Sequence, residues 1–126
     1  MPLVTSNARA AYGRREGPVR TNRSQEYDLL AHCTQQLAMA WTNRKSDFAS
    51  LAVALTENLQ LWSALAADVA EARNGLPAPL RAKLFYLYEF TASHTRAVLD
   101  HRGSVEVLVD INTAVMRGLR GDGGGT

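Results

Sequence analysis

The side chains best suited to catalysis or metal binding in this chain are its single cysteine and its three histidines. His32 and Cys33 are adjacent, so on a helix they would project about 100° apart and share a metal ion poorly. His94 and His101 are seven residues apart and could face the same way, but two ligands without a third make a poor metal site. The sequence therefore predicts no metal site.

Neither the acidic side chains nor the common enzyme motifs give evidence of a catalytic site. The chain contains no glycine-rich phosphate loop, no serine-hydrolase elbow and no HExxH metalloprotease pattern. Asp68 and Glu71 fit a solvated helix end better than an acid–base pair, and Cys33 fits a small buried side chain better than a nucleophile. We expect a protein that is not an enzyme, with no catalytic residues and no cofactor.

The elements that position these residues are predicted to be helices, because apolar side chains recur at spacings of three and four. The expected helices cover residues 24–42, 47–73, 79–102 and 105–118. The run from Leu84 to Phe90 has strand-like composition, but helix-forming residues flank it and no turn residue bounds it. The predicted fold class is all-α, a small antiparallel bundle of about four helices.

The expected helix ends carry residues that commonly cap helices. Ser24, Ser46 and Ser104 stand where a side-chain oxygen would accept the first free backbone N–H groups. Gly75 and Gly103 stand at two carboxyl ends, where glycine readily takes the left-handed conformation. These five positions predict where the connections between helices lie.

Charge divides the chain unevenly. Residues 1–23 carry five arginines and one glutamate, a net charge of +4, while the rest carries nine basic and eleven acidic groups, a net of −2. We expect a flexible basic arm over 1–23, a helical domain over 24–119 and a disordered glycine-rich tail over 120–126. No apolar run approaches the roughly 20 residues of a membrane span, and no secretory signal begins the chain, so we expect a cytoplasmic protein.

The third expected helix offers one candidate surface for a partner. Its inner stripe is expected to include Leu80 and Leu87, which leaves Tyr86 and Phe90 on another side. A small bundle does not cover every side of such a helix, so these two aromatic residues are candidates for partner binding. The alternative is that they rim the core.

The fourth expected helix offers a second candidate surface. Asp110 and Asn112 flank Ile111 in mid-helix, where short polar side chains are disfavoured. They could hydrogen-bond a bound helix, with Met116 adding adaptable contact area, or they could be a solvated pair. Together, the two surfaces predict a docking groove between the third and fourth helices.

Two distinctive segments lie in the middle of the chain: Leu61 to Asp68 reads LWSALAAD, and Asn74 to Pro77 reads NGLP. Weaker matches keep the same order at residues 10–12, 26–27, 80–82, 93–99 and 108–119. With their spacing, these segments resemble the FlaF family of flagellar biosynthesis regulators of alphaproteobacteria. The resemblance and the helical pattern imply a mainly structural role for the motif residues Trp62, Asp68, Asn74, Gly75, Leu76 and Pro77.

The resemblance implies a cytoplasmic protein that binds flagellin and promotes its synthesis and export. Flagellin is then the expected partner, through a terminal amphipathic helix held in a groove, and the counterpart protein FlbT is a further candidate partner. An alternative is an RNA-binding regulator of flagellin messenger that uses the basic arm, although the net charge of −2 on the body argues against nucleic acid. A third alternative is a structural component of the export apparatus.

Overall fold

The computed structural model describes residues 22–71 and 73–120, with side chains from Ser24 onward. Every regular element in these two ranges is a helix. The helices are α2 (Asn22–Thr42), α3 (Phe48–Ala70), α4 (Ala78–Leu99) and α5 (Glu106–Arg120). The all-α prediction is confirmed, and the strand-like run from Leu84 to Phe90 lies within α4. The expected arm and tail lie almost wholly outside the described residues.

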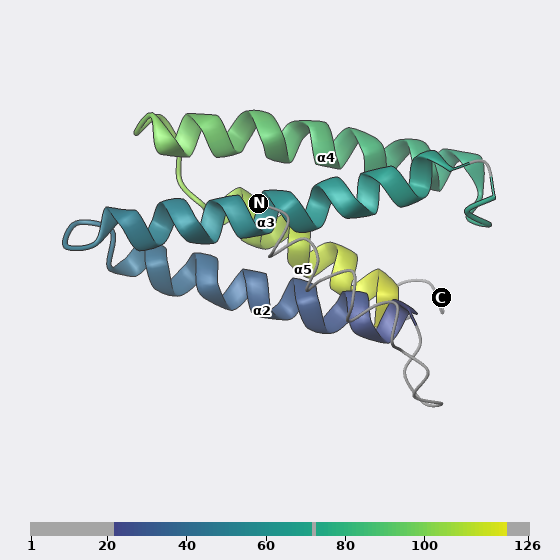
Figure 1. The fold of residues 1–126 in the computed structure, drawn as a ribbon, viewed down its shortest axis with the longest axis horizontal. Helices are drawn as coiled ribbons and strands as arrows, with labels where there is room; N and C mark the ends of the chain where they lie inside the picture. The colour runs from purple at the N-terminus through teal and green to yellow at the C-terminus, as the bar shows by residue number, and fades with distance from the viewer. Residues whose placement is uncertain (1–21, 72, 121–126) are drawn as a thin grey trace.

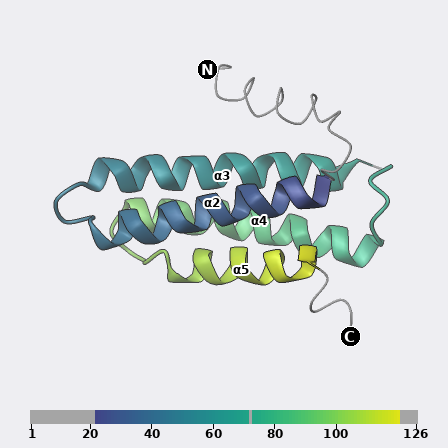
Figure 2. The same cartoon turned by 90° about the horizontal axis from the view of Figure 1, so that it is seen from below.

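The helices form an antiparallel four-helix bundle (Figure 1). α3 lies between α2 and α4 and contacts both along its length, and α5 packs mainly along α2. Seen from below, α3 and α5 lie on opposite sides of the bundle (Figure 2). α4 and α5 contact each other only sparsely, because α5 crosses away from α4 toward the start of α2.

The largest apolar cluster lies at the end of the bundle that carries the α2–α3 and α4–α5 connections. Its buried members are Leu37, Ala40, Leu51, Ala54, Leu55, Val98, Val105 and Leu108. Trp41 and Phe48 pack on the edge of this cluster. α4 contributes only Val98 to it, so most of α4 lies away from this apolar cluster.

Two predicted amino-terminal caps are wrong. α2 begins at Asn22, so Ser24 lies inside the helix and does not cap it. The cap of α3 is Asp47 rather than Ser46, because its carboxylate accepts both the backbone N–H and the hydroxyl of Ser50, at 3.1 and 2.6 Å. These two bonds hold the pKa of Asp47 below its usual value.

α4 ends at Leu99, three residues before the predicted end. His101 takes the left-handed conformation, with φ of 61°. Its N–H donates to the carbonyl oxygen of Val98 at 3.0 Å, and the N–H of Arg102 donates to that of Ala97 at 2.7 Å. This pair of bonds is the Schellman closure, here built on histidine in place of the usual glycine.

Gly103, which was predicted to end this helix, has a different structural role. A side chain at this position would place its Cβ 3.0 Å from Cε1 of His94. His94 is half-buried, and its Nε2–H donates to the carbonyl oxygen of Ser104 at 2.7 Å. The Ser104 hydroxyl accepts the N–H of Glu106 at 3.2 Å, as a cap of α5 should. Gly103 therefore allows the connection to α5 to lie against His94.

Candidate functional site

The two halves of α4 differ in burial. Its buried residues are Thr91, Thr95 and Val98, all in the carboxyl-terminal half. In the amino-terminal half, Leu80 is 42% exposed and Tyr86 is 63% exposed, and no side chain is fully buried. The prediction that Leu80 faces the core is therefore wrong, because α3 runs along this end of α4 but α5 has diverged from it.

A row of three side chains, one turn apart, connects the buried half of α4 to the exposed half. His94 bonds the carbonyl oxygen of Ser104, just before α5 begins. Phe90 stacks on His94 with ring centroids 5.5 Å apart and is half-buried. Tyr86, one turn further, is largely exposed. We call these residues the Tyr86–His94 row; its His94 end contacts the connection to α5, and its Tyr86 end is exposed.

The structure separates the three candidate residues on α5. Asp110 is exposed and Met116 is half-buried. Asn112 is only 1% exposed, and its side chain bonds three residues inside the bundle. A partner cannot reach its amide in this fold, so we leave Asn112 out of any docking surface. The idea that Asp110 and Asn112 form a solvated pair is also wrong.

Asn112 is the centre of what we call the buried polar layer, formed by half-buried Thr34 and by fully buried Asn58, Trp62 and Asn112. The indole N–H of Trp62 donates to Oδ1 of Asn112 at 2.9 Å. The Asn112 amide donates to Oδ1 of Asn58 at 2.8 Å and to the Thr34 hydroxyl at 3.1 Å. The Thr34 hydroxyl itself donates to the carbonyl oxygen of Leu30 at 2.7 Å. These bonds connect α2, α3 and α5.

The sequence contained a signal for this layer. Asn58 stands on the apolar stripe of α3, four residues before Trp62, and Asn112 stands four residues after the buried Leu108. A polar residue on an apolar stripe indicates a buried hydrogen bond as readily as a solvated face. Within the described residues, two buried polar atoms have no partner: Nδ2 of Asn58 and Oγ1 of Thr91.

The distinctive NGLP sequence forms the connection from α3 to α4. The Asn74 amide donates to Asp68 at 2.9 Å, and Oδ1 of Asn74 accepts the N–H of Leu76 at 3.1 Å. Gly75 has φ of 93°, which confirms the expected left-handed conformation. Pro77 occupies the position before the first residue of α4. These side chains shape the turn.

Arg81 fastens the amino-terminal end of α4 to this turn. Its Nε donates to the carbonyl oxygen of Leu76 at 3.1 Å, and a second guanidinium nitrogen donates to that of Val69 at 3.4 Å. Val69 is buried near the end of α3. The start of α4 is therefore held by polar bonds to the turn and to α3, in a region where few of its apolar side chains are covered.

The remaining reactive groups do not assemble into a site. Cys33 is buried, and burial raises the pKa of its thiol to about 11, so it stays protonated at neutral pH. Among residues 22–71 and 73–120, no three histidine, cysteine or acidic side chains lie close enough to hold a metal ion. The four described helices include none long and apolar enough to span a membrane.

Comparison with known proteins gives one match. The family model described as "Flagellar protein FlaF" matches residues 8–119, which is most of the chain and nearly all of its described part. No curated protein and no solved structure matches. The matched region includes the LWSALAAD and NGLP segments, with Trp62 in the buried polar layer and Asn74 in the α3–α4 turn. The chain belongs to the FlaF family of flagellar proteins.

Proposed function

We propose that this protein is a non-enzymatic, cytoplasmic flagellin-binding protein that promotes flagellin synthesis and export in the manner of a chaperone. The observation that carries the proposal is the exposure of Tyr86, at 63%, at the open end of the Tyr86–His94 row. An aromatic ring on a rigid helix is a good anchor for a partner, because little conformational freedom is lost on binding.

The occupant we propose is an amphipathic helix of flagellin, placed against the amino-terminal half of α4 where α5 diverges from it. Tyr86 supplies an exposed apolar contact, and half-buried Phe90 supports it from one turn further along. On α5, half-buried Met116 would extend the apolar contact and exposed Asp110 would lie at its polar rim. This proposed surface replaces the docking groove predicted from the sequence and omits Asn112.

Isothermal titration of the full chain with purified flagellin tests the proposal. Because a good aromatic anchor contributes about 2 kcal/mol or more, Tyr86→Ala should weaken binding by at least about tenfold. Its melting temperature should stay close to that of the unmodified protein, because Tyr86 is mostly exposed. The matched control is Met39→Ala on α2, which removes a similarly exposed apolar side chain, 59% exposed, and should leave affinity unchanged.

Equal affinities for the Tyr86→Ala and Met39→Ala proteins would contradict this placement of flagellin. Titration of the same protein with flagellin messenger RNA tests the RNA-binding alternative, which predicts binding that falls steeply with salt. Co-purification from cells tests whether FlbT joins the complex or whether the protein instead stays with the export apparatus.

A further inference from the structure

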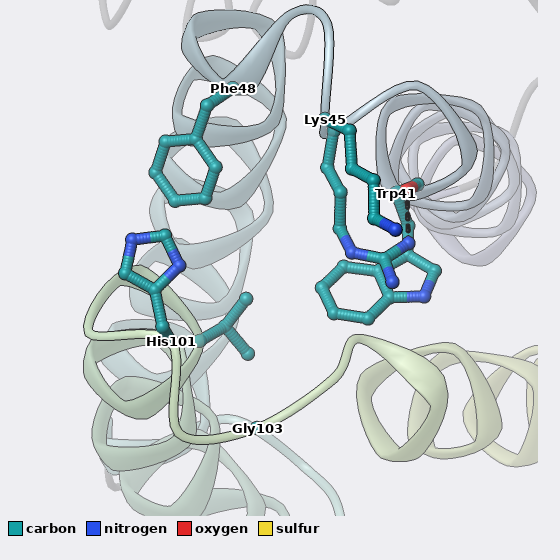
Figure 3. A pocket seen from close by; sticks show the side chains of 7 residues that line it. Trp41, Lys45, Phe48, His101 and Gly103 are labelled. Carbon is teal, nitrogen blue, oxygen red and sulfur yellow. Dashed lines mark hydrogen bonds between the residues drawn. The ribbon is translucent and has the colours of Figure 1, made fainter.

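A cavity of about 630 Å³ lies at the opposite end of the bundle from the α3–α4 turn. It lies between the α2–α3 and α4–α5 connections (Figure 3). Val98, a buried member of the apolar cluster, lines it. Cavities that hold small ligands have volumes of roughly 300–1,000 Å³. This cavity is therefore of the size of a small-molecule site and has an apolar floor.

Flat side-chain groups form two opposite sides, or walls, of the cavity. On one side, the rings of Phe48 and His101 lie 4.9 Å apart at an angle of 33°. On the other side, the guanidinium of Arg44 lies over the ring of Trp41, 3.8 Å from its centroid. A flat apolar group between these walls would contact aromatic or guanidinium groups on both sides.

The cavity also carries positive charge. Arg44 uses one N–H group on the carbonyl oxygen of Trp41, at 2.9 Å, which leaves further donors on the same guanidinium. Exposed Lys45 projects toward the same space (Figure 3). The carboxylates in the two connections have other partners, since Asp47 accepts from Ser50 and Asp100 pairs with Arg102 at 3.2 Å.

We propose that this cavity binds a carboxylate attached to a flat apolar group, either the last residue of a peptide chain or a free aromatic acid. The flat group would lie between the Phe48–His101 wall and the Arg44–Trp41 wall. The carboxylate would accept hydrogen bonds from Arg44 and Lys45, and charge-assisted bonds of this kind are the stronger ones. The site is separate from the Tyr86–His94 row and does not depend on flagellin binding.

The left-handed conformation of His101 offers a way to remove one wall without disturbing the backbone. Glycine adopts a φ of 61° without steric strain, so His101→Gly should keep the turn while removing the ring. Lys45→Ala removes a positive charge from the opposite side of the cavity, where exposed Lys45 lies in the α2–α3 connection. The matched control is Lys83→Ala, which removes an exposed lysine from α4.

The test is an NMR titration of the full chain with 3-phenylpropionate and, separately, with 3-phenylpropanamide, which has the same shape without the charge. The acid should shift the indole signal of Trp41 and the backbone signals of Lys45 and Gly103 in a saturable way. The amide, the His101→Gly protein and the Lys45→Ala protein should each bind about tenfold more weakly or worse, while the Lys83→Ala protein binds normally.

A second pair of probes separates the two sources of the carboxylate. These are an acetylated tetrapeptide ending in phenylalanine with a free carboxylate, and the same peptide as an amide. Tight binding of the free-acid peptide would assign the site to a chain end, and binding of 3-phenylpropionate alone would assign it to a free acid. Equal shifts with acids and amides, or no saturable shift at these three residues with any acid, would overturn the proposal.

Discussion

The two halves of α4 have the same backbone conformation and different surroundings. The carboxyl-terminal half buries Thr91, Thr95 and Val98, whereas the amino-terminal half buries no side chain and exposes Tyr86. Both halves are equally helical, so helix formation here does not depend on how deeply each turn is buried. The comparison shows that one helix can pack in the interior at one end and leave apolar side chains exposed at the other.

Polar bonds hold α4 at the start of its exposed half and again in its buried half. Arg81 ties its start to the carbonyl oxygens of Leu76 and Val69. In the buried half, the ring of His94 bonds the carbonyl oxygen of Ser104 and stacks on Phe90. These bonds add to the packing of half-buried Leu84 and Leu87, while Leu80 and Tyr86 remain exposed.

The largest expected effect is on the buried layer. Trp62 is fully buried, so Trp62→Ala should cost about 3–5 kcal/mol in free energy of unfolding, through a cavity and the loss of its bond to Asn112. A domain of this size has only about 5–15 kcal/mol in total. Urea unfolding followed by circular dichroism measures the loss. A Trp62→Ala protein with nearly unchanged stability would show that the layer does not hold the bundle together.

The next largest effect on stability distinguishes Asn112 from Asp110, two polar residues of α5 that the sequence analysis treated alike. Asn112→Ala leaves the indole N–H of Trp62 without its acceptor and should cost about 3 kcal/mol. Asp110→Ala is the matched control, and it should change stability by less than about 0.5 kcal/mol because Asp110 is exposed. Thermal unfolding of both proteins is the measurement, and equal melting temperatures would contradict the polar layer.

These two residues also show what the sequence could and could not predict. Apolar spacing was enough for four helices and for the burial of Leu30, Leu37, Leu51 and Trp62. It placed Asn112 in the wrong environment, because a stripe through Ile111 and a stripe through Asn112 fit the spacing almost equally well. Only the positions of α2 and α3, which bring Thr34 and Asn58 to Asn112, decide between them.

The predicted helix ends are correct where a single residue can form the cap. They are wrong where neighbouring residues could each form it. Gly75 takes the left-handed conformation as expected. At the start of α3, adjacent Ser46 and Asp47 both have capping oxygens, and only the geometry selects Asp47. At the end of α4, His101 takes the left-handed position in place of Gly103, which is needed where the chain passes His94. The exposure of Leu80 depends on the divergence of α5, which no local pattern encodes.

The smallest expected effects come from two glycines, Gly103 beside His94 and Gly118 in α5. Gly103→Ala should destabilise the protein by about 1–2 kcal/mol, because the added Cβ would lie 3.0 Å from the His94 ring. Gly118→Ala in α5 meets no atom within 4 Å and should stabilise the helix by about 0.5–1 kcal/mol. Thermal unfolding compares the two. Stabilisation by both substitutions would mean that His94 is not held against the α4–α5 connection.

Hydrogen exchange of the full chain, alone and saturated with flagellin, tests most directly that the amino-terminal half of α4 is the docking surface. Exchange read by mass spectrometry resolves residues 78–90 from the buried end of the same helix. The account predicts slower exchange over 78–90 in the complex, with little change in α3 around Asn58 and Trp62, which are already buried. Slower exchange confined to α2 and α3, with residues 78–90 unchanged, would contradict it.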